Sequence, residues 1–71
     1  MVFDYSKLKG RIIEKFGTVS AFAESMGYAQ SGLYISIKHG KPISSKRIIE
    51  MTDALEIESK DVGEFFYTPK V

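Results

Sequence analysis

Hydrophobic positions along the chain recur every three or four residues, which is the spacing of an α-helix, and turn residues divide them into short segments. The first segment predicts a helix over residues 5–16. Asp4 precedes it and is expected to cap its first turn, because a carboxylate accepts bonds from free amide groups there. Gly17 is expected to end it. The spacing assigns the core stripe to Leu8, Ile12, Ile13 and Phe16, and the outward positions to Lys7, Lys9, Arg11 and Lys15.

The stretch from Thr18 to Gly40 predicts two short helices joined by a tight turn. Thr18 is a suitable N-cap for the first of them, because its hydroxyl can accept a bond from an amide of the first turn. Gly27 stands where this helix should end in the left-handed conformation, which costs glycine least. The apolar stripe between cap and turn consists of Phe22, Ala23 and Met26.

The second helix of this pair opens near Ala29 and carries Leu33 and Ile37 one turn apart, so both side chains are expected to face the core. Two short helices at a steep angle, with a glycine in the turn between them, form the helix-turn-helix arrangement. We assign its core to residues 18–38.

The loop at residues 39–43 is the clearest break in the chain, since it contains Gly40 and Pro42. Ser44 or Ser45 is expected to cap a fourth helix over roughly residues 45–55. Ser59 is expected to cap a short fifth helix. The inward positions are assigned to Ile48, Ile49, Met51, Thr52 and Leu55 in the fourth helix, and to Val62, Phe65 and Phe66 in the fifth. Every periodic segment is helical, so the predicted fold class is all-α, a compact bundle of about five short helices.

A chain of 71 residues allows one domain, which we assign to residues 1–71. It has no cysteine, so neither a disulfide nor a thiolate metal site is expected, in agreement with a reducing cytoplasm. No apolar run approaches the ~20 residues that a membrane helix needs. No signal peptide is expected, because Asp4 stands where its basic region would be. These features predict a cytoplasmic protein that does not enter a membrane.

One set of residues carries a resemblance to a known family. The run Phe22-Ala23-x-x-Met26-Gly27, with Leu33 six residues and Ile37 ten residues after the glycine, resembles the Cro and repressor family of temperate phages. The segment Gly40-Lys41-Pro42, with Ser44 and Ser45, is similar to the loop that follows the recognition helix in that family. The opening sequence FDYSKLKGRIIEKFGT and the total length also resemble short Cro-like and modulator-of-repression proteins.

The resemblance implies a five-helix, lambda repressor-like domain that binds duplex DNA sequence-specifically, usually as a dimer. It implies a phage transcriptional regulator in a lysis–lysogeny switch, acting in the cytoplasm of a bacterial host. The family pairs through its C-terminal region, so a homodimer contact is expected there. The candidates are Phe65, Phe66 and Tyr67, which equally suit the last layer of the core.

The first residues of a recognition helix reach base edges in the major groove. In this chain they are Gln30 and Ser31, followed by Tyr34 and Ile35. A glutamine amide can bond N6 and N7 of one adenine, which discriminates by about 1–3 kcal/mol. Ser31 can bond several base atoms or a phosphate. Tyr34 can reach a phosphate through its hydroxyl, and Ile35 offers apolar contact to a thymine methyl group.

Phosphate contacts are expected from basic residues that flank the recognition helix, because such charges fix register without reading bases. The candidates are Lys38, His39 and Lys41 after that helix, Lys46 and Arg47 at the start of the fourth, and Thr18 at the start of the motif. Net charge is only +1, but its distribution is uneven. Residues 1–47 hold eight Lys and Arg against three acids, which gives +5, and residues 48–71 hold two against six, which gives −4.

Tyr34 and Ile35 also support a second hypothesis, because exposed aromatic and aliphatic side chains on a helix are typical of a protein-docking surface. The chain also has Val19 where the family often has a phosphate-bonding glutamine. The alternative function is therefore an anti-repressor, or modulator, that binds a partner repressor with its helix-turn-helix face and blocks DNA binding by that repressor.

An enzyme is not expected. The chain has one histidine, no cysteine and no phosphate-binding glycine loop. His39 lies at the end of a predicted helix, where the negative end of the helix favours a cation. Glu56 and Glu58 suit a solvated turn better than an acid–base pair. The sequence therefore predicts no catalytic residue, no metal site and no cofactor.

Overall fold

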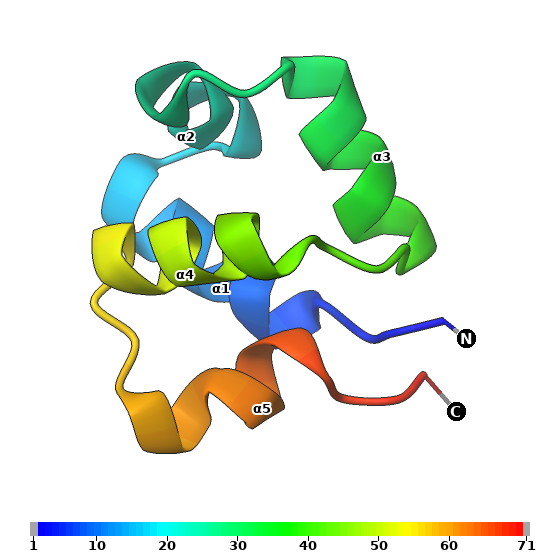
Figure 1. The fold of residues 1–71 in the computed structure, drawn as a ribbon. Helices are drawn as coiled ribbons and strands as arrows, with labels where there is room; N and C mark the ends of the chain where they lie inside the picture. The colour runs from blue at the N-terminus through cyan, green and yellow to red at the C-terminus, as the bar shows by residue number, and fades with distance from the viewer. Residues whose placement is uncertain (1, 71) are drawn as a thin grey trace.

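Five α-helices and one turn of 3₁₀-helix follow one another in the computed structural model, which describes residues 2–70 (Figure 1). No strand occurs in this range, and an isolated antiparallel bridge between Phe3 and Pro69 brings the two ends of the chain together. The prediction of an all-α fold of about five short helices is confirmed. The elements are α1 (Ser6–Phe16), α2 (Val19–Met26), α3 (Gln30–His39), α4 (Ser45–Ala54), η1 (Ser59–Asp61) and α5 (Val62–Phe66).

Side-chain caps start α2 and α4 where they were expected. Thr18 Oγ1 accepts a bond of 3.0 Å from the Ala21 amide, and Ser44 Oγ accepts one of 3.4 Å from the Arg47 amide. Each cap satisfies a donor that has no partner within its helix.

Two predicted caps need correction. The first helix begins at Ser6, with Tyr5 as its N-cap residue, so the predicted start was one residue early. Asp4 lies just outside the helix, where its carboxylate accepts the Ser6 amide at 2.9 Å. Ser59 does not cap a helix, because it lies inside the turn η1 and η1 has no side-chain cap.

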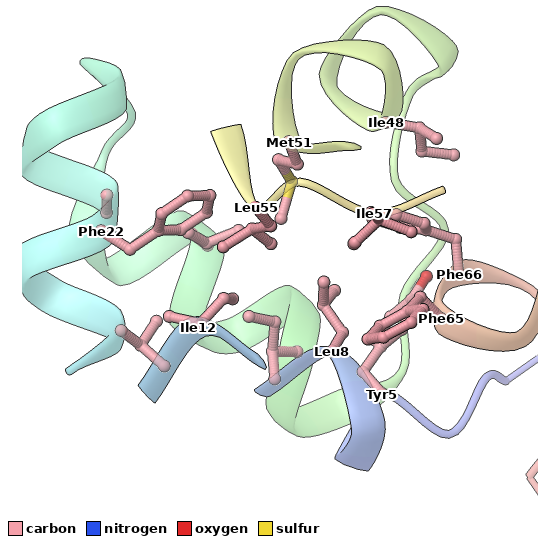
Figure 2. Packing of buried hydrophobic residues seen from close by; sticks show 14 residues of the cluster. Tyr5, Leu8, Ile12, Phe22, Ile48, Met51, Leu55, Ile57, Phe65 and Phe66 are labelled. Carbon is pink, nitrogen blue, oxygen red and sulfur yellow. The ribbon is translucent and has the colours of Figure 1, made fainter. Parts of the chain in front are cut away.

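The buried core draws on every α-helix, and Figure 2 shows side chains from α1, α4 and α5 pointing toward one another. Two predictions fail: Ile13 is 45% exposed and Ile49 is 70% exposed. Each follows an isoleucine that is buried, and the next position on a helix is turned by about 100°, which here brings Ile13 and Ile49 to the solvent side. Within residues 2–70, no helix is both long and apolar enough to cross a membrane. The core consists of Tyr5, Leu8, Ile12, Val19, Phe22, Ala23, Leu33, Ile37, Ile48, Met51, Leu55, Ile57, Phe65 and Phe66.

A stripe of cations on α1 turns toward the acidic C-terminal half of the chain. Lys7 pairs with Glu64, and Lys15 pairs with Glu56. Arg11 lies between the two lysines, and its guanidinium donates to the Leu55 carbonyl at 2.9 Å. Such exposed ion pairs each contribute about 0–1 kcal/mol. Lys7, Lys9 and Lys15 are exposed, as predicted, and Arg11 is half-buried. The contacts of Lys7, Arg11 and Lys15 neutralise part of the charge asymmetry within the molecule.

The end of α3 is held against the N-terminal arm at Gly40. This glycine has φ = 67°, and its carbonyl accepts a bond of 3.0 Å from the Phe3 amide. A Cβ atom at Gly40 would lie 2.2 Å from the Phe3 carbonyl oxygen and 2.9 Å from the Phe3 nitrogen. The next residue is held as well, because the Tyr5 hydroxyl donates to the Lys41 carbonyl at 2.8 Å. A side chain at position 40 is therefore excluded by backbone atoms.

The N-terminal arm is held in turn by the C-terminal tail. The Asp4 amide donates to the Thr68 carbonyl at 2.7 Å, and the Lys70 amide donates to the Val2 carbonyl at 3.1 Å. The two ends of the chain therefore form a short ribbon beneath the end of α3 (Figure 1).

We expect Gly40→Ala to destabilise the protein by roughly 3 kcal/mol or more, because it combines a left-handed backbone with a backbone collision. Gly27→Ala is the matched control, since Gly27 is also left-handed but a Cβ atom there meets nothing within 4 Å. Gly27→Ala should lower the free energy of unfolding by only about 1 kcal/mol. Urea unfolding measures both, and equal losses would contradict the close approach at Gly40.

Candidate binding surface on the third helix

A tight turn sets the direction in which α3 leaves α2. Gly27 is left-handed, with φ = 76° and ψ = 20°. Its amide bonds to the Glu24 carbonyl at 3.2 Å, and the Tyr28 amide bonds to the Ala23 carbonyl at 2.8 Å. This pair of bonds is the Schellman motif, which satisfies carbonyls that have no partner at a helix end. The predicted role of Gly27 is confirmed.

One side of α3 is fixed in the core and the other faces solvent. Leu33 and Ile37 are buried, as predicted. Gln30, Ser31, Tyr34 and Ile35 are all exposed, and we call these four residues the α3 surface. Tyr34 and Ile35 expose 49% and 42% of their area. The structure therefore leaves all four predicted contact residues accessible, and their roles in binding stay predictions.

Tyr28 fixes the turn to α4, a role that was not predicted from the sequence. Its hydroxyl donates to a Glu50 carboxylate oxygen at 2.6 Å. The Arg47 guanidinium carbon lies 4.5 Å from the centre of the Tyr28 ring. Burial, followed by the bond to Glu50, raises the pKa of Tyr28 to about 12. Arg47, predicted as a phosphate contact, thus also stacks on the residue that sets the start of α3.

The other predicted phosphate contacts lie around the C-terminal end of α3. Lys38, His39, Lys41 and Lys46 are exposed. Within residues 2–70, none of these side chains forms an ion pair with a carboxylate. Thr18 is also exposed, but its hydroxyl oxygen already accepts the Ala21 amide as a helix cap. The available positive charge therefore lies beside the α3 surface.

A pocket of about 410 Å³ opens between the start of α1 and α3. Three lysines line it, from α1, from α3 and from the C-terminal tail, together with Tyr34 and Asp4. Hydrogen bonds from Ser6 hold the pKa of Asp4 below its usual value, so this carboxylate is ionised at neutral pH. The lysines are Lys9, Lys38 and Lys70. A partner of the α3 surface meets cations along this edge.

The predicted homodimer contact at Phe65, Phe66 and Tyr67 is wrong for the two phenylalanines. Phe65 and Phe66 retain 4% and 1% of their exposure, so they form the last layer of the core, which was the alternative. Tyr67 is exposed, and its ring packs edge-on against Phe3 with 5.9 Å between centroids. Two of the three residues are therefore inaccessible to another chain.

Comparisons with known proteins place this chain near phage regulators. A family model described as "protein of unknown function (DUF739)" matches residues 1–69. No curated protein matches the chain. The fold is similar to the solution structure of the modulator of repression (MOR) of the temperate bacteriophage TP901-1 from Lactococcus lactis. That match has 31% sequence identity and a TM-score of 0.80, and it covers 100% of this chain and 96% of the other. The expected resemblance to modulator proteins is supported, and the Cro-like assignment stays a prediction.

We expect Tyr28→Phe to remove a pH-dependent part of the stability at alkaline pH. The pKa of Tyr28 is raised from 10.0 to about 12 in the folded state, so its contribution is complete below pH 10. It is lost as pH rises from 10 to about 12, because the unfolded chain releases this proton first. Urea unfolding across this range should show a smaller decline for Tyr28→Phe than for the unmodified protein. Tyr67→Phe, at an exposed ring, is the control, and an unchanged decline in Tyr28→Phe would refute the role of the Tyr28–Glu50 bond.

Proposed function

This chain belongs to the DUF739 family, and we propose that it is a phage or prophage regulatory protein that binds a partner repressor through the α3 surface. The similarity to a phage modulator of repression along the whole chain supports this function. The observation that carries it is the exposed pair Tyr34 and Ile35 at the middle of α3.

The chemistry of the α3 surface favours a protein partner. A binding site for a protein has an aromatic or aliphatic centre inside a polar rim. Here Tyr34 and Ile35 supply the centre, while Gln30, Ser31 and Lys38 supply the rim. Lys38 Nζ lies 6.0 Å from the centre of the Tyr34 ring, which keeps a cation beside the apolar centre. DNA offers few apolar groups other than thymine methyls, so Ile35 gains more from a protein surface.

The proposed mechanism is competition by steric cover. A repressor that docks its DNA-reading surface on α3 cannot place that surface in the major groove at the same time. The modulator binds free repressor and has no affinity for the DNA-bound form. By mass action it therefore lowers the occupancy of the operator by the repressor.

Duplex DNA is the second candidate partner, and the unpaired cations beside α3 favour it. In that case α2 and α3 act as a helix-turn-helix with residues 18–38 as its core, within a single domain of residues 1–71. Lys38, Lys41 and Lys46 would contact phosphates, and Gln30 would read one base pair. The two functions are compatible in a mixed complex of this protein and the repressor on DNA.

We expect Tyr34→Ala and Ile35→Ala each to weaken binding to the partner repressor by about tenfold or more, because truncation of a central apolar residue costs about 1–2 kcal/mol or more. Isothermal titration calorimetry with the DNA-binding domain of that repressor measures the change. Ile13→Ala, at a comparably exposed position on α1, is the matched control and should bind normally. Unchanged affinity in both α3 variants would rule out this docking surface.

The DNA-binding function makes a separate prediction. Gln30→Ala should relax preference at one base pair by about 1–3 kcal/mol. Lys41→Ala should weaken binding to all DNA sequences alike. It should also reduce the slope of log affinity against log salt concentration by about 1. Gel shifts on DNA flanking the gene, with and without the repressor and at two salt concentrations, distinguish these effects. If neither substitution changes DNA binding, the groove model is wrong. Loss of repressor binding in Tyr34→Ala with DNA binding intact would identify the repressor as the partner of this face.

A further inference from the structure

A second apolar surface lies on α4, and it shares no residue with the α3 surface. A groove of about 430 Å³ runs between α4 and the segment that contains η1 and the start of α5. Ile48, Ile57 and Val62 line its apolar part. Ile49 stands at its edge with 70% of its area exposed, more than any other large hydrophobic residue of residues 2–70. A side chain this apolar and this exposed suits burial against another molecule.

Charges of opposite sign flank Ile49 along the exposed face of α4. Lys46 precedes it by three residues and Asp53 follows it by four, so all three residues lie on one helix face. Both charged side chains are exposed. Within residues 2–70, neither Lys46 nor Asp53 takes part in an ion pair. The nearby Glu50 is already bonded to Tyr28.

We propose that a second copy of this chain packs on α4, with the two α4 helices antiparallel about a two-fold axis that passes beside Ile49. A two-fold contact uses the same patch on both copies, so it requires a self-complementary surface. With the axis between positions 49 and 50, Lys46 of each copy faces Asp53 of the other. The isoleucines at position 49 then meet at the centre, and two ion pairs form on the same side of the interface.

A second copy fits this face better than a basic peptide does. A basic partner would pair with Asp53 but would place like charge beside Lys46. A second copy satisfies both, because the positive and negative positions lie almost equally far from Ile49. An interface centred on one helix is small, so the dimer is expected to be weak.

Sedimentation velocity from about 10 μM to about 1 mM tests the proposal over the range of weak association. The unmodified chain should shift from monomer to dimer. Lys46→Glu and Asp53→Lys alone should each weaken the dimer by about tenfold or more, because each places like charges opposite one another at two positions. An equimolar mixture of the two variants should dimerise again, because their charges are then complementary. The double variant should also recover.

Controls separate this interface from folding and from the proposed function. Ile49→Asp should abolish the dimer with its helical circular dichroism unchanged, since position 49 is exposed. Lys41→Glu reverses a charge outside the interface and should leave the dimer intact. Tyr34→Ala should also leave the dimer intact, so failure of the α3 proposal is distinguishable from failure of this one.

A chain that stays monomeric at about 1 mM would overturn the proposal. So would a dimer that Ile49→Asp does not affect, or single charge variants that do not recover on mixing.

Discussion

The close approach of Gly40 to the backbone of Phe3 holds the candidate surface in place. Leu33 and Ile37 bury one side of α3, but burial alone lets a short helix slide or rotate. The bond from the Phe3 amide to the Gly40 carbonyl, together with the bond from Tyr5 to Lys41, fixes the C-terminal end. At the other end, Tyr28 joins the turn to Glu50 on α4. With both ends held, the exposed side of α3 keeps one orientation without support from a partner.

The positive charges of the chain are divided between contacts inside the molecule and exposed positions. Three of the four cations of α1 are occupied by Glu56, Glu64 and backbone carbonyls at the end of α4, which helps to hold the C-terminal half against the first helix. The lysines around the end of α3, together with Lys9 and Lys70 in the neighbouring pocket, are left for an external partner. A net charge of +1 therefore hides a local positive region beside an apolar centre, and this combination suits a regulator that engages a DNA-binding protein, DNA or both.

The parts of the fold that depend on local chemistry could be predicted from the sequence. Thr18 and Ser44 cap helices, Gly27 ends one, and Leu33 and Ile37 face inward, because each role is set by neighbours within a few residues. Helical spacing could not decide which member of the pairs Ile12–Ile13 and Ile48–Ile49 is buried. That choice depends on where another helix lies. Contacts between distant segments, such as Tyr28 with Glu50 or Lys7 with Glu64, leave no periodic signal. The α3 surface was identified because exposure follows from the positions of its buried residues.

The central claim is that the α3 surface is the contact site for a partner repressor, and amide chemical shifts test it most directly. The isotope-labelled protein is titrated first with the DNA-binding domain of the partner repressor, and separately with the operator duplex of that repressor. If the α3 surface is the contact site, the repressor domain causes its largest shifts at Gln30, Ser31, Tyr34 and Ile35. Unchanged shifts at these four residues, with the changes confined to other helices, would contradict it.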